Sequence, residues 1–127
     1  MNYKIYTDGA SRGNPGPSCA GGVIYLLDEV IYELSVPLGI TTNNIAEYTA
    51  LKLTLEKAIE LHIDSADVFM DSKLVVEQMN KRWKIKNERL KELNQEIQNL
   101  LPNFTHITFN FVYRHLNTHA DKLANQF

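Results

Sequence analysis

Apolar and polar residues alternate in the first third of the chain with the two-residue period of β-strands. The alternation over residues 2–8 predicts a first strand. Residues 20–38 form two more β-rich runs with Asp28-Glu29 between them, which predicts a hairpin. The chain therefore opens with three strands.

The segment that leaves the first strand, DGASRGNPG (residues 8–16), is rich in glycine. It continues irregularly to about Ser18, whereas a tight hairpin turn needs only two residues. Asp8 is expected at the end of the strand, followed by backbone that can approach another group closely, because glycine has no Cβ. Gly21 and Gly22 in the second strand predict a further close approach.

The rest of the chain changes to the period of helices and returns to strands twice. Apolar residues recur every three or four positions after Thr41, Thr42 and Asn43, the candidate caps of a long helix. Later elements are a strand at 66–71, a helix at 72–80 capped by Ser72, a helix at 88–101 ended by Pro102, a strand at 105–113 and a final helix capped by Thr118. The order βββαβααβα predicts an α/β fold with a five-stranded mixed sheet flanked by helices, and residues 1–127 as one domain.

Four acidic residues lie near element ends in this scheme. Asp8 and Asp71 end strands, while Glu47 and Asp121 lie in the first turns of helices. Each alone has an ordinary explanation as a turn residue, a cap or a partner of the helix dipole. As a set they would converge at one end of the sheet. Carboxylates that lie this close together require a cation to offset their repulsion. Oxygen ligands of this kind suit Mg²⁺.

Composition narrows the class of protein. The chain has 127 residues, 44% hydrophobic and 22% charged, which is typical of a globular domain. It has no visible signal peptide or membrane span, and Cys19 is the single cysteine, so we expect a cytoplasmic protein. A net charge of −2 argues against nucleic-acid binding. If the four acids are neutralised by cations, however, the rest of the chain carries a net charge of +2.

Four segments together resemble the motifs of the type 1 ribonuclease H family, in order and spacing. They are YTDGASRGNPGPSCAGGVI, TTNNIAEYTAL, VFMDSKLVVEQM and HLNTHADKLAN. The resemblance covers residues 3–125 and implies the ribonuclease H-like fold. It also implies hydrolysis of the RNA strand of RNA–DNA hybrids with two Mg²⁺ or Mn²⁺ ions, leaving 5′-phosphate and 3′-hydroxyl ends.

The resemblance also implies roles for particular residues. Asp8 would be shared by two ions, Glu47 and Asp71 would hold the ion on the leaving-group side, and Asp121 the ion that activates water. The implied substrate contacts are Ser11, Arg12, Gly13, Asn14, Asn44, Ser72, Trp83, Lys84 and Arg114. For Asn14 the alternative is a plain turn residue, and for Trp83 a side chain tucked into the core.

The chain departs from better-known members at two places. The segment MNKRWKIKNERL is short, as in the compact subgroup without a basic protrusion. Two interpretations of its basic residues are open, contact with substrate phosphates or a solvated loop: Lys81, Arg82, Lys84 and Lys86. No histidine matches the family's loop histidine. Arg114 matches an arginine that precedes the last helix in the compact subgroup. His115 is an auxiliary candidate for proton transfer, but the expected role of His115 and His119 is that of exposed residues at the helix start.

Two other functions remain open from the sequence. One is a catalytically silent hybrid-binding module, which an intact acid set disfavours. The other is a different nuclease of the same fold, which the glycine-rich loop together with Asn44 disfavours. Nothing in the sequence indicates a membrane, an obligatory protein partner or an oligomer, so a monomer is expected.

Overall fold

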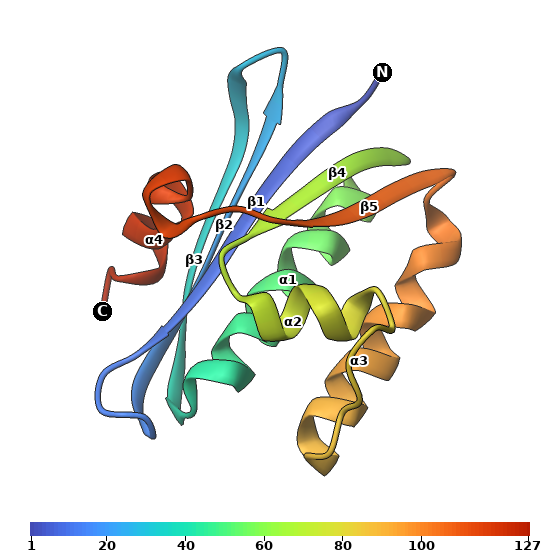
Figure 1. Ribbon diagram of the computed structural model, residues 1–127. Coiled ribbons are helices and arrows are strands. Elements are labelled where there is room, and N and C mark those ends of the chain that lie inside the picture. Colours follow the sequence, from blue (N-terminus) through green and yellow to red (C-terminus); the bar gives the residue numbers. More distant parts are fainter.

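The computed structural model describes residues 1–127, whose five strands form one mixed sheet (Figure 1). The strands lie in the order β3-β2-β1-β4-β5. Their bounds are β1 Tyr3–Ser11, β2 Gly16–Leu26, β3 Glu29–Thr41, β4 Ser65–Met70 and β5 His106–Phe111. The first three pair antiparallel, and β4 and β5 continue the sheet parallel to β1. The predicted element order and mixed sheet are confirmed.

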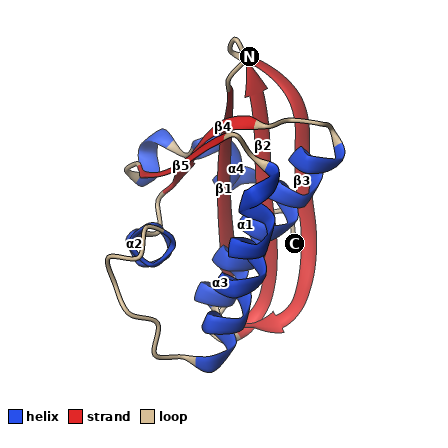
Figure 2. Cartoon of the chain, turned by 90° about the vertical axis from the view of Figure 1, so that its right-hand side faces the viewer, coloured by secondary structure: helices blue, strands red, loops and turns tan.

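Four helices cover the two faces of the sheet unequally. They are α1 Asn43–Glu60, α2 Lys73–Met79, α3 Glu88–Leu100 and α4 Thr118–Ala124. The helix α1 packs on β1 and β2, and α3 packs against α1, as Figure 2 shows. The main hydrophobic core fills this side, with Ile5, Tyr48, Leu51, Val68 and Leu93 among its buried members. The short α4 packs on the opposite face of β1 and β2. None of the helices combines the length and apolar character needed to traverse a bilayer.

The helix caps agree with the sequence in two places and differ in a third. The side chains of Thr42 and Ser72 accept hydrogen bonds from the backbone N–H groups three residues later and so begin α1 and α2, as expected. Thr118 was expected to cap α4, but the structure shows that the cap position belongs to Asn117. The Asn117 side chain does not bond the helix; its Nδ2 donates to the Thr7 carbonyl at 3.0 Å and ties α4 to β1.

Several strand boundaries also differ from the prediction by a few residues, and two of these differences bear on the site and the hairpin. The strand β1 does not end at Asp8 but continues to Ser11, because β2 pairs with it as far as Ser18 after β4 has ended. The irregular segment is therefore limited to residues 12–15. The β2–β3 turn is Leu27-Asp28, one residue earlier than predicted, and both residues have positive φ as in the turns that favour tight hairpins.

The glycines at Gly9 and Gly21 allow two helices to touch the sheet backbone. A Cβ at Gly9 would lie 2.2 Å from the Ala46 carbonyl carbon in α1. A Cβ at Gly21 would lie 2.5 Å from the Ala120 carbonyl oxygen in α4. Close approach was expected at both, and its object is in each case a helix of the protein itself. These two contacts set the heights of α1 and α4 over the sheet.

Candidate metal centre

The strands β1 and β4 separate next to two of the predicted acids. Their last paired residues are Thr7 and Met70, and the next residue on each strand is Asp8 or Asp71. Because β1 and β4 are parallel and separate at this point, they present both carboxylates at the same end of the sheet. The expected juxtaposition of Asp8 and Asp71 is confirmed. Asp8 is buried and Asp71 is partly exposed.

Glu47 reaches the same place from α1. It is the fifth residue of that helix, not a first-turn residue as expected, and its side chain is buried. The Gly9 backbone N–H donates to Glu47 Oε1 and also to Asp8 Oδ1, the latter at 3.0 Å. One backbone donor therefore holds two carboxylates. Glu47 can reach this donor because Gly9 has no Cβ and lets α1 lie close to β1.

The three carboxylates form a cluster that is unfavourable without a cation. One oxygen from each of Asp8, Glu47 and Asp71 lies within 4.8 Å of the others. Burial is the main factor that raises the pKa of Asp8, with the Glu47 charge next, and burial likewise raises the pKa of Glu47 and Asp71. Divalent cations with a preference for hard oxygen ligands fit this donor set.

Asp121 faces the cluster from α4. It lines the same cleft, of about 470 Å³, as Asp8, Glu47 and Asp71. Its Oδ1 accepts hydrogen bonds from Asn125 Nδ2 at 3.2 Å and from Arg114 at 3.4 Å. The four predicted acids therefore share one cleft, with three in a tight group and Asp121 across from them.

The residues of the β1–β2 turn border this cleft at one side. Ser11 and Ser72 line the cleft itself. Asn14 and Asn44 line a neighbouring depression, and Asn14 Oδ1 accepts from the Asn43 N–H at 2.8 Å. Asn14 therefore lies in the turn and joins it to the start of α1.

Two other residues of the predicted substrate set belong to this turn. Arg12 and Gly13 are exposed, and the Arg12 guanidinium lies 4.2 Å from the centre of the Phe127 ring. Gly13 has φ of +86°, a conformation that favours glycine, and a Cβ there would make only an ordinary contact with the Pro15 carbonyl oxygen at 3.7 Å.

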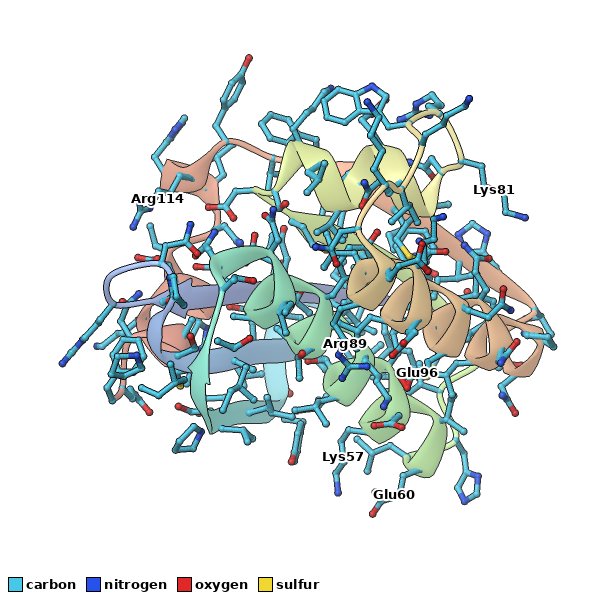
Figure 3. All side chains as sticks on the ribbon, turned by 90° about the horizontal axis from the view of Figure 1, so that it is seen from below. Lys57, Glu60, Lys81, Arg89, Glu96 and Arg114 are labelled. Carbon is cyan, nitrogen blue, oxygen red and sulfur yellow. The ribbon has the colours of Figure 1, made fainter.

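The connector between α2 and α3 lies away from the acids. Neither Trp83 nor Lys84 lines the cleft, and Lys81 and Arg114 lie on opposite sides of the view in Figure 3. Trp83 is 46% exposed, so the alternative of a core side chain is wrong. Arg82 does not extend freely to solvent: it forms two hydrogen bonds with Glu77, at 2.7 and 2.8 Å.

This geometry separates the basic residues of the connector into two kinds. With the expected RNA–DNA hybrid as ligand, replacing Lys81, Lys84 and Lys86 with Gln should reduce the salt dependence of binding by about one unit of slope per lost phosphate contact. Arg82→Gln should instead lower the melting temperature and leave the slope unchanged, because its guanidinium is held by Glu77. Binding measured over a salt series, beside thermal unfolding, checks both. An unchanged slope in the triple lysine variant would assign those lysines to solvent.

The histidines differ from the expectation at one position. His115 is exposed and stacks on Tyr113 with ring centroids 6.1 Å apart. His119 was expected to be an exposed helix-start residue; instead its ring nitrogens bond Tyr25 and Glu33 on the sheet. No pattern in the sequence indicated Asn117, which is buried beside the cluster; burial raises the pKa of Asp71, and Asn117 opposes this rise.

The sequence model described as "Reverse transcriptase-like" matches residues 6–127. A relative from Mycobacterium tuberculosis, "Bifunctional protein Rv2228c", is 46% identical over 127 residues, which are 98% of this chain and 35% of the relative. The chain therefore spans about a third of that relative's length.

Solved structures are similar over almost the whole chain. RNase H1 from the halophilic archaeon Halobacterium salinarum superposes with a TM-score of 0.95 at 36% identity, covering 99% of this chain and 96% of that one. LC11-RNase H1 in complex with RNA/DNA hybrid gives a TM-score of 0.90 at 37% identity, with 98% and 94% coverage.

Proposed function

The chain belongs to the ribonuclease H family, and from this premise we propose that it hydrolyses the RNA strand of RNA–DNA hybrids. The observation that carries the proposal is the carboxylate cluster at the split between β1 and β4, faced by Asp121 across the cleft. The similar LC11-RNase H1, which was solved with RNA/DNA hybrid, supports this substrate class. Residues 1–127 are proposed to act as one domain and as a monomer.

The acids would hold two Mg²⁺ or Mn²⁺ ions. Asp8 would serve both, Glu47 and Asp71 the ion on the leaving-group side, and Asp121 the other. Bound ions of this kind stabilise the attacking and leaving oxygens of an in-line phosphoryl displacement. The products would carry 5′-phosphate and 3′-hydroxyl ends.

The protein's own groups prepare the acids for this task. The Gly9 N–H orients the Asp8 and Glu47 carboxylates by donating to both. Arg114 pairs with Asp121, and its side chain is 77% exposed, so it can also reach a phosphate at the mouth of the cleft. His115 lies beside Arg114 and remains a candidate for proton transfer.

Recognition of the hybrid would use the turn that borders the cleft. Ser11, Arg12, Gly13, Asn14 and Asn44 lie at the ends of β1 and α1 that border the acids. We propose that they face the minor groove, where 2′-hydroxyl groups distinguish RNA from DNA. Ser72 would act at the cleft, with Trp83 and Lys84 farther along the substrate.

The proposed function predicts metal-dependent cleavage of one substrate class. With Mg²⁺ or Mn²⁺ the protein should cut the RNA strand of a hybrid, and excess chelator should stop it. Duplex DNA and duplex RNA of the same sequence should be cut at least about 100-fold more slowly, because one lacks the 2′-hydroxyl and the other the deoxyribose strand. Cleavage with chelator present, or equal cutting of duplex DNA, would contradict the proposal. Binding of hybrid without cleavage would identify a silent binding module instead.

A further inference from the structure

The helix α4 carries Asp121 but cannot define its own position. It has seven residues, and helices of this length are unstable without tertiary contacts. Its apolar residues Ala120 and Ala124 are fully buried against β2, where Gly21 has no side chain. Such a contact between small groups fixes the height of the helix, while polar side chains at its ends can fix its rotation.

One of these polar contacts is formed near the C-terminal end of α4. Ser35 Oγ on β3 donates to the Leu123 carbonyl at 2.7 Å. This contact holds the helix on the side of β3, the edge strand of the sheet. It leaves the first turn, which contains Asp121, to be held by other groups.

His119 supplies the corresponding contact in the first turn. Its Nδ1 bonds the Tyr25 hydroxyl on β2, and its Nε2 bonds Glu33 on β3. The ring also packs edge-on against Tyr25, with centroids 5.8 Å apart. A single neutral tautomer satisfies both bonds, because Nε2–H donates to the carboxylate while Nδ1 accepts from the hydroxyl.

His119 and Asp121 face opposite sides of α4. Residues two apart in a helix point about 200° from each other, since 3.6 residues make one turn. His119 accordingly meets β2 and β3, while Asp121 lines the cleft. Figure 1 shows α4 beside β2 and β3, on the other side of the sheet from α1. A rotation of the first turn away from Tyr25 and Glu33 would therefore move Asp121 relative to Asp8.

We propose that His119 is a positioning residue for the metal centre: through Tyr25 and Glu33 it holds α4 in the rotation that places Asp121 opposite Asp8. This inference rests on the proposed function, because it concerns the ion that Asp121 would help to hold. Loss of His119 should weaken divalent-ion binding. Hybrid affinity should stay the same, because His119 lies behind α4 and outside the cleft.

The test compares His119→Ala with a matched histidine. His106 also pairs with a carboxylate on the sheet, Asp67 at 3.0 Å, but lies at the start of β5, away from the cleft. Mn²⁺ binding to the free protein should be measured by calorimetry, and hybrid affinity separately without metal. His119→Ala should bind Mn²⁺ about tenfold more weakly, the lower end of the range for residues that orient metal ligands. His106→Ala should bind it as the wild type does.

Conservative variants distinguish positioning from a general loss of stability. His119→Asn and His119→Gln each can replace one ring nitrogen and should recover part of the Mn²⁺ affinity. Tyr25→Phe removes one of the two hydrogen bonds and should weaken Mn²⁺ binding in the same direction, which keeps the test available if His119→Ala does not fold.

Two results would overturn the inference in different ways. Unchanged Mn²⁺ affinity in folded His119→Ala or Tyr25→Phe, with only the melting temperature lowered, would make His119 a structural residue and leave the proposed function standing. If the wild-type protein itself bound no Mn²⁺, the proposed function would fail, and this inference with it.

Discussion

Replacing Asp71 with Asn should reduce hybrid cleavage by about 10²–10³-fold or more, the scale on which loss of one positioned electrostatic group acts. The substitution keeps the shape of the side chain and removes one charge from the group formed with Asp8 and Glu47. Asp71 is not needed as a helix cap, since Ser72 accepts from the Val75 N–H at 3.3 Å. Cleavage measured at saturating metal and hybrid tests the prediction.

The same substitution should leave the metal-free protein as stable as before or more stable. Burial is the main factor that raises the pKa of Asp8 and of Glu47, and the Asp71 charge raises both further, so the folded cluster opposes ionisation. Folded-state pKa values above the unfolded ones mean that stability declines as pH rises above about 4, where free carboxyls ionise. Asp71→Asn should therefore flatten this decline. Thermal unfolding in chelator over a pH series measures it.

Asp67 on the same strand gives the matched control. Its carboxylate accepts hydrogen bonds from Thr108 and Asn2 and pairs with His106, and the Thr108 bond is the main factor that lowers its pKa. Asp67→Asn should thus lose stability at neutral pH and keep normal cleavage, the reverse of Asp71→Asn. Near-normal cleavage by Asp71→Asn would remove Asp71 from the metal centre.

Sequence periodicity was sufficient for most of the fold. Helices and strands of ordinary length bury one face, and that face is visible as a period in the sequence. The adjacency of Asp8 and Asp71 followed from two parallel strands whose ends both carry an acid. The end of β1 was placed too early because β1 has two neighbours, and the pairing with β2 continues after β4 has ended.

The details missed from sequence depend on particular contacts and on local backbone conformation, which the hydrophobic period does not report. His119 bonds Glu33, which is 86 positions away, and no local pattern reports such a pair. Arg82 reaches Glu77 because the chain reverses at Lys81, whose φ is +61°. A close approach was expected at the glycines of this segment, with the hybrid as the approaching group; at Gly9 the group that approaches is α1, which nothing near it in sequence indicates.

Gly9→Ala should damage both stability and catalysis, because this contact joins the fold to the metal centre. The new Cβ would lie 2.2 Å from the Ala46 carbonyl carbon and 2.3 Å from the Glu47 nitrogen, both backbone atoms of α1. The helix would have to move away from β1, at a cost near or above the ~3 kcal/mol upper end of typical overpacking. Glu47 would move with it, away from the Gly9 N–H that orients it.

Gly22→Ala provides the comparison, because its new Cβ would meet a side chain rather than backbone. The nearest atom is Thr54 Oγ1 at 2.1 Å. Adding Thr54→Ala should therefore restore part of the stability lost in Gly22→Ala, and cleavage by the double variant should approach the wild-type rate. No truncation of a neighbouring side chain can relieve Gly9→Ala in this way. Denaturant unfolding and cleavage below the melting temperature of each variant measure both effects. Wild-type activity in folded Gly9→Ala would show that Glu47 does not depend on the contact between β1 and α1.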